Sequence, residues 1–175
     1  MATLTFYPTS VVSAVSGFTA AQLANVLGNT TTYAVHTAAV AVNGGIGGTF
    51  AFDLSSLPSN IVINSFTFTL IAKASTASRR SAYSVDLFGS GGSSIIKTMS
   101  VPLAITDTTA TVVMTGTELA NAGWTVDELR TGANEWTGTF ISTNATSTTT
   151  SWQKFYITVD YTVVASNILF SGELF

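Results

Sequence analysis

The sequence contains no cysteine, one histidine and three prolines, and only 9% of its 175 residues are charged. Without cysteine, the chain can form neither disulfides nor thiolate metal sites. An ordinary soluble domain has about 25% charged residues. Here threonine, serine, alanine and glycine replace the missing charges, and such short side chains lose little entropy when a neighbour covers them. The low charge therefore favours a permanent place in an assembly, although a simple threonine-rich β domain would share it.

Long apolar runs and basic clusters are missing as well. No apolar run approaches the roughly 20 residues that span a bilayer, so we expect no membrane protein. The first ten residues lack the basic start of a signal peptide, which predicts a protein that is cytoplasmic when made. The net charge is −3 with six Lys and Arg, and the adjacent pair Arg79 and Arg80 is predicted to lie in a polar loop. Nucleic-acid binding needs a basic stripe, so we expect none.

The clearest periodic segment is residues 152–163, in which apolar and polar side chains alternate. One predicted face carries Phe155, Ile157, Val159, Tyr161 and Val163, and the other carries Trp152, Lys154, Tyr156, Thr158, Asp160 and Thr162. Alternation of this kind is typical of a strand with one buried and one wetter face. We expect it to be the central strand of an antiparallel sheet. Residues 61–73 alternate similarly, with Val62 predicted on the same face as Phe66 and Phe68, and Ile63 on the opposite face.

Further short strands are predicted between glycine, proline and polar turns, at residues 3–7, 30–42, 46–54, 82–88, 94–101, 109–115 and 136–142. Pro102 is expected to end the strand before it. Capping boxes that begin at Thr19 and Thr125 predict two short helical turns. Many short strands with little helix indicate an all-β fold, an antiparallel β-sandwich or jelly-roll-like domain. No repeat or linker divides the chain, so we expect one domain over residues 1–164.

Residues suited to catalysis or metal binding are scarce. His36 stands in no Ser–His–Asp pattern and is expected to be a packed or surface side chain. Asp127 and Glu128 are adjacent and do not share a helix face, so Glu128 is expected to cap the helical turn. The glycines of residues 43–48 lack the lysine of a phosphate loop. We predict no enzyme, no catalytic residue, no metal site and no cofactor, and a calcium site built from distant aspartates stays open.

Three aromatic residues form a candidate glycan platform, namely Trp136, Trp152 and Tyr156. If they lie on the face opposite the core, they could stack on sugar rings. The alternative is that the tryptophans close the edges of the core, since a large aromatic side chain near a strand end buries much apolar area.

The segment 165–175 follows the natural end of the last strand. It carries the large apolar residues Ile168, Leu169, Phe170, Leu174 and Phe175. Because chain ends are usually polar, such an apolar arm either folds back on its own domain or docks on a neighbouring subunit, for example as an added strand. The sheet already looks complete, so we favour the neighbour and predict that these five residues bind a partner. Deleting residues 167–175 should then leave the fold stable.

Several segments together resemble a β-sandwich domain of tailed-phage virion proteins, especially minor tail proteins. They are the opening Tyr7-Pro8-Thr9-Ser10, residues 25–34, the strand after Leu57-Pro58, residues 83–88 with their glycine turn, residues 124–129, and the final Val159-Asp160-Tyr161-Thr162-Val163. The resemblance rests on order and spacing up to about Val164, and it includes no catalytic motif.

The resemblance implies a structural component of a phage virion that is assembled in the host cytoplasm. A minor tail or tail-tip protein is the first expectation, and a capsid decoration protein is the second. Expected partners are other virion proteins of the tail or capsid and further copies of the chain. A carbohydrate-binding module that contacts a glycan of the host surface is the alternative from a different class.

Overall fold

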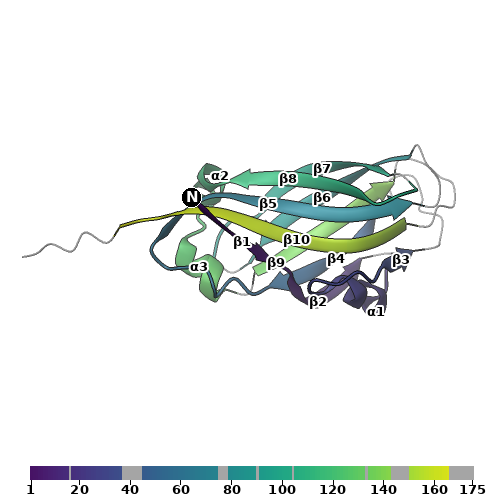
Figure 1. Ribbon diagram of the computed structural model, residues 1–175, viewed down its shortest axis with the longest axis horizontal. Helices are drawn as coiled ribbons and strands as arrows, with labels where there is room; N and C mark the ends of the chain where they lie inside the picture. Colours follow the sequence, from purple (N-terminus) through teal and green to yellow (C-terminus); the bar gives the residue numbers. More distant parts are fainter. Residues whose placement is uncertain are drawn as a thin grey trace, which may run out of the picture.

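A computed structural model describes residues 1–15, 17–36, 45–74, 79–89, 91–103, 105–132, 134–142 and 150–165. Two antiparallel sheets stack on each other and confirm the predicted β-sandwich (Figure 1). Sheet A contains β1 (Ala2–Phe6), β3 (Ala34–His36), β5 (Ile61–Ala74), β8 (Thr108–Thr115) and β10 (Thr150–Val163). Sheet B contains β2 (Pro8–Val15), β4 (Gly45–Phe52), β6 (Arg79–Phe88), β7 (Ile95–Leu103) and β9 (Asn134–Ser142).

Strand β10 is the central strand of sheet A, as its periodicity predicts. It pairs with β1 and β3 on one side and with β5 on the other, in a sheet of order β1-β10-β5-β8. Sheet B has the order β2-β4-β9-β6-β7. Four of the five side chains predicted on the inward face of β10, namely Phe155, Ile157, Val159 and Tyr161, are buried. The fifth, Val163, is 54% exposed at the end of the strand, so this part of the prediction is wrong. The sandwich core therefore forms on the face that the alternation assigns to it.

Two strand predictions are wrong at their ends. Arg79 and Arg80 do not belong to a loop, because they begin β6 and pair with Leu103 and Pro102 of β7. Pro102 does not end the preceding strand, since it lies within β7. This strand is the edge of sheet B, where a residue without an N–H can be accommodated. Of the predicted strand 30–42, residues 34–36 form β3, and residues 37–42 lie outside the described part.

Two β-bulges reverse the predicted faces of three side chains. The register between β10 and β5 shifts between Trp152 and Lys154, and again between Asp160 and Tyr161. A bulge adds one residue to one strand, so the alternation changes face there. As a result, Trp152 is buried with the core, whereas Val62 is 55% exposed. Ile63 turns toward the end of the sandwich, where it lines a pocket.

Short helices close the sandwich. Helix α1 (Ala20–Leu23) continues into the 3₁₀ turn η1 (Ala24–Val26), while α2 (Gly116–Asn121) and α3 (Val126–Thr131) lie together at the end where β10 leaves (Figure 1). The capping boxes at Thr19 and Thr125 are confirmed. A third capping box, at Thr115, begins α2, a helix that was not predicted from the sequence. No helix in the described ranges is both long and apolar enough for a bilayer.

Helix α2 is stabilised at both ends. At its start, Glu118 accepts hydrogen bonds from the backbone N–H and hydroxyl of Thr115, and it also pairs with Lys97 of β7. At its end, Gly123 has a φ of 87°, and the N–H of Trp124 donates to the carbonyl of Leu119 at 2.9 Å. This arrangement is a Schellman motif, in which a left-handed glycine ends the helix. The ion pair and the caps tie α2 to both sheets.

The Lys97–Glu118 pair predicts a pH dependence of stability. Lys97, and after it Thr115, lower the pKa of Glu118 from 4.5 to about 2. A lowered carboxyl pKa stabilises the fold above the unfolded-state pKa, and this contribution is lost as the pH falls through the folded-state pKa. The variant Glu118→Gln keeps the cap but loses the charge. Because the ion pair is partly exposed to solvent, we expect its Tm to lie no more than about 2–4 °C below that of the wild type at pH 7, with the difference disappearing as the pH falls from 4.5 to about 2.

Calorimetry at several pH values checks this prediction, with Glu128→Gln as the matched control. Glu128 caps α3 in the same way through Thr125, and its pKa is lowered by those cap bonds without a lysine among the causes. The control should therefore change Tm less than Glu118→Gln. Equal changes in the two variants would mean that Lys97 contributes nothing.

Candidate functional site: the outer face of sheet A

The outer face of sheet A presents hydroxyl-bearing side chains in rows that cross the strands. The register places Thr3, Asp160, Ser65 and Thr115 in one row, Thr5, Thr158, Thr67 and Val113 in the next, and Tyr156, Thr69 and Thr111 in a third. Neighbouring strands lie about 4.8 Å apart, and alternate residues along a strand about 6.8 Å. Thr3, Thr5, Thr111 and Thr115 are exposed, Thr67 and Thr158 are half-buried, and Thr69 is buried. The face is thus a regular array of short polar groups.

A pair of tyrosines stands within this array. Tyr156 points outward from β10, and Tyr7 follows directly after β1 on the same side. Their ring centroids lie 5.6 Å apart with the planes inclined at 46°, a favourable aromatic geometry. Both side chains are half-buried, so part of each ring is open to solvent. Mutual packing therefore restricts the orientation of the two rings.

Charged groups on this face are few. Asp160 lies in the first row, and its Oδ1 is buried without a hydrogen-bond partner among the described residues. The two lysines of the face contact neutral neighbours. The Nζ of Lys154 donates to the Oδ1 of Asn29 at 2.7 Å. The Nζ of Lys73 lies 3.9 Å from the ring centroid of Tyr33, a cation–π contact. The hydroxyl of Tyr33 in turn donates to Asp107 at 2.7 Å. The face around Tyr156 is therefore polar with little net charge.

Such a surface can contact a ligand in two ways. The Thr115 hydroxyl is engaged in the cap of α2, and Thr69 is buried. Each of the other threonine hydroxyls can both donate and accept a hydrogen bond, and the tyrosine rings offer an apolar face with a polar tip. These properties suit an uncharged, hydroxyl-rich molecule with apolar C–H surfaces. They do not suit a phosphate or another strongly anionic ligand, which needs unpaired basic side chains.

The three residues of the predicted platform do not lie together on this face. Tyr156 is placed there as predicted. Trp152 is 2% exposed, and its ring centroid is 4.9 Å from that of Phe18, so it fills the core edge and is not available to a sugar. The backbone of Trp136 pairs with Phe50 and Leu87, and its side chain lies outside the described part.

The sequence alone did not indicate Tyr7 and the threonine rows as part of a site. The alternation of Thr3, Thr5 and Tyr7 in the first strand was visible. The sequence did not show that this strand pairs with β10. This pairing brings Tyr7 beside Tyr156.

The remaining candidate residues fall elsewhere. His36 is 6% exposed and packs edge-on against Phe18, with 5.7 Å between the ring centroids, and burial lowers its pKa. Of the two expected environments, packed or on the surface, His36 has the packed one. Across the described residues, no group of three His, Cys, Asp or Glu side chains could hold a metal ion. The five predicted partner-binding residues of the C-terminal arm lie outside the described residues.

The fold and this face together define a β-sandwich domain with an open, hydroxyl-rich sheet surface that carries little net charge. No protein-family model matches the sequence, and no curated protein matches it. Among solved structures, the chain is similar to a CBM35 domain of Abf62 from Cellvibrio japonicus, with 16% identity and a TM-score of 0.43. The match covers 95% of this chain and 99% of that domain. A likeness this remote says nothing about a ligand.

Proposed function

We propose that this protein is a non-catalytic module that binds a neutral polysaccharide through the outer face of sheet A. The observation that carries the proposal is the Tyr7–Tyr156 pair, which is half-exposed and surrounded by rows of threonine. An extended sugar chain has alternating C–H faces and hydroxyls, which match aromatic rings and hydroxyl-bearing side chains at strand spacing. Pre-packed rings also reduce the ordering cost of binding.

The test is affinity electrophoresis and pull-down with neutral polysaccharides such as cellulose, xylan, mannan and chitin. The wild type should bind at least one of them. Tyr156→Ala should weaken that binding about tenfold, which corresponds to about 1.4 kcal/mol, because the ring is lost. Tyr156→Phe should keep most of the binding if the ring face makes the contact.

The control is Ile96→Ala on β7 of the opposite sheet, where the side chain is 65% exposed. This variant should bind like the wild type. If no neutral polysaccharide is retained, or if Tyr156→Ala binds as well as Ile96→Ala, the outer face of sheet A is not a glycan surface. Thermal unfolding of each variant checks that a loss of binding does not come from a loss of fold.

We also propose a second function, that of a structural subunit of a tailed-phage virion. A minor tail or tail-tip protein is the first form of this proposal, and a capsid decoration protein is the second. The low charge of the chain supports it, since a surface of short side chains is covered by neighbours at little entropic cost. Mass spectrometry of gradient-purified particles tests it. Finding the protein only outside the particles would count against this function.

A further inference from the structure

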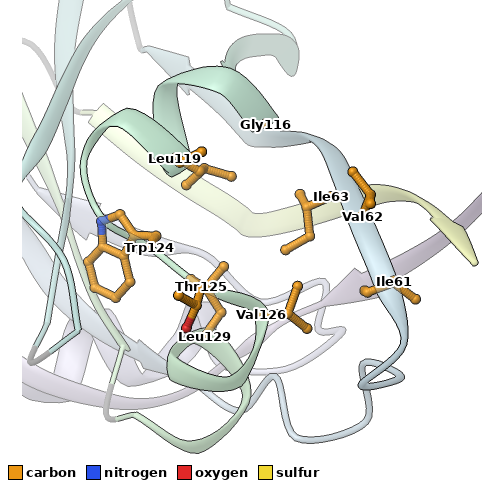
Figure 2. A pocket seen from close by; sticks show the side chains of 10 residues that line it. Ile61, Val62, Ile63, Gly116, Leu119, Trp124, Thr125, Val126 and Leu129 are labelled. Carbon is orange, nitrogen blue, oxygen red and sulfur yellow. The ribbon is translucent and has the colours of Figure 1, made fainter. Parts of the chain in front are cut away.

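An apolar pocket opens at the end of the sandwich that α2 and α3 cover. It has a volume of about 250 Å³. Figure 2 shows Leu119 entering from α2, Ile63 from β5, and Val126 and Leu129 from α3. Trp124, which lies between the two helices, closes the inner side. Its Nε1 donates to the carbonyl of Ser93 at 3.0 Å, so the indole is held in place. The Trp124 wall is therefore fixed, and most of the pocket lining is apolar.

Exposed valines continue the apolar surface beside this pocket. Val62, Val163 and Val164 are 55%, 54% and 48% exposed. They lie where β10 pairs with the first residues of β5, since Val163 is opposite Ile61, and Thr162 is opposite Val62. Apolar side chains gathered around a pocket in this way mark an interaction surface more often than single exposed residues do.

The described chain leaves the domain at this same end. The N–H of Val164 donates to the carbonyl of Asn60 at 2.8 Å, and the side-chain amide of Asn60 donates to the carbonyl of Val164 at 3.3 Å. These bonds keep the end of β10 extended. Figure 1 shows the strand running outward past α2 and α3, away from the body of the sandwich. The chain therefore departs close to its own pocket but does not head into it.

The segment that follows, 166–175, is ten residues long. It contains five large apolar residues, Ile168, Leu169, Phe170, Leu174 and Phe175. Fully extended, ten residues span at most about 33–36 Å, enough to cross to a neighbouring domain of this size. A side chain of leucine, isoleucine or phenylalanine is of a size to enter the pocket.

We infer that the segment 166–175 of one copy docks in the α2–α3 pocket of a second copy, and that the segment 166–175 of the second copy docks in the pocket of the first. The docking segment and the pocket lie at the same end of the molecule. A single two-fold axis can therefore relate two copies so that both docking contacts form, and the assembly closes as a dimer. Docking on the same chain would require the strand to reverse within a few residues after Val164. The exposed valines of the two copies would meet near the axis.

Light scattering coupled to gel filtration, over a wide range of concentrations, tests the inference. The full chain should be a dimer. Deletion of 166–175 should produce a folded monomer with a nearly unchanged Tm. Ala120→Arg should weaken the dimer at least about tenfold, which is about 1.4 kcal/mol. Ala120 is exposed on α2 and lines the pocket, so the arginine places a charge where an apolar side chain should enter without disturbing the core.

Thr117→Arg is the matched control. Thr117 is exposed on the same helix and is not among the pocket-lining residues, so this variant should remain dimeric. A full chain that is monomeric at every concentration overturns the inference. If deletion of 166–175 also lowers the Tm of that monomer, the segment lies in the pocket of its own chain. A dimer unaffected by Ala120→Arg would also overturn it, because the contact would then lie elsewhere.

Discussion

Replacing Phe155 by alanine is expected to lower the free energy of unfolding by about 3–5 kcal/mol, the range for truncating a large buried aromatic residue. Phe155 is 4% exposed and stands at the centre of the sandwich. Its ring centroid lies 5.6 Å from that of Phe50 and 5.8 Å from that of Phe52, both on β4 of the opposite sheet. It lies 6.2 Å from that of Phe68 on the adjacent strand β5. The substitution therefore removes aromatic contacts that join the two sheets.

Urea or guanidinium unfolding measures this effect, with Thr158→Ala as the control on the same strand. Thr158 points to the outer face and is half-buried, so its truncation should change the free energy of unfolding by no more than about 1 kcal/mol. A cost for Phe155→Ala close to that of the control would mean that the aromatic cluster does not hold the sheets together.

Replacing Gly116 by alanine is expected to cost about 3 kcal/mol, at the upper end of the range for overpacking. A Cβ at this position would lie 2.0 Å from the carbonyl oxygen of Ile63 and 3.2 Å from that of Asn64. Both atoms belong to the backbone of β5, so no side chain can move aside. The first residue of α2 must then shift away from the sheet, and the pocket wall should shift with it.

Thr117→Ala is the control for this prediction, because Thr117 is the next residue of α2 and is exposed. Its substitution should change the free energy of unfolding by less than about 0.5 kcal/mol. Denaturant unfolding of the two variants gives the comparison. If Gly116→Ala is as stable as the control, α2 does not pack on β5 as closely as the distances from the Gly116 Cβ position to the β5 carbonyl oxygens indicate.

The alternation of apolar and polar residues predicted the fold class well, because it follows directly from which side chains are buried. In β10, the alternation from Phe155 to Tyr161 assigns each inward side chain correctly. The capping boxes at Thr19 and Thr125 also predicted helix starts, since such a cap is a local interaction within four residues. The cap at Thr115 carries the same pattern with Glu118 and was overlooked, although Gly123 stands where a helix of this length should end.

Bulges are what the alternation could not predict. The register shifts beside Trp152 and Asp160 depend on how β10 pairs with β5, and strand partners are distant in the sequence. One shift buries Trp152, which removes it from the predicted glycan platform. The other exposes Val62 and turns Ile63 toward the pocket. A one-residue change of register moves a side chain to the other face, so local patterns fail at these points.

The amino-acid sequence by itself determined the class of the fold, the central strand, two helix starts and the low charge, because each of these depends on composition or on neighbours within a few residues. The tertiary structure alone decided which strands pair. That pairing places Tyr7 of the first segment beside Tyr156 near the end of the chain, and aligns threonines of four strands in rows. It also brings β5, α2 and α3 around one pocket. Surfaces of this kind are assembled from distant segments, and their position is set by packing of the whole core.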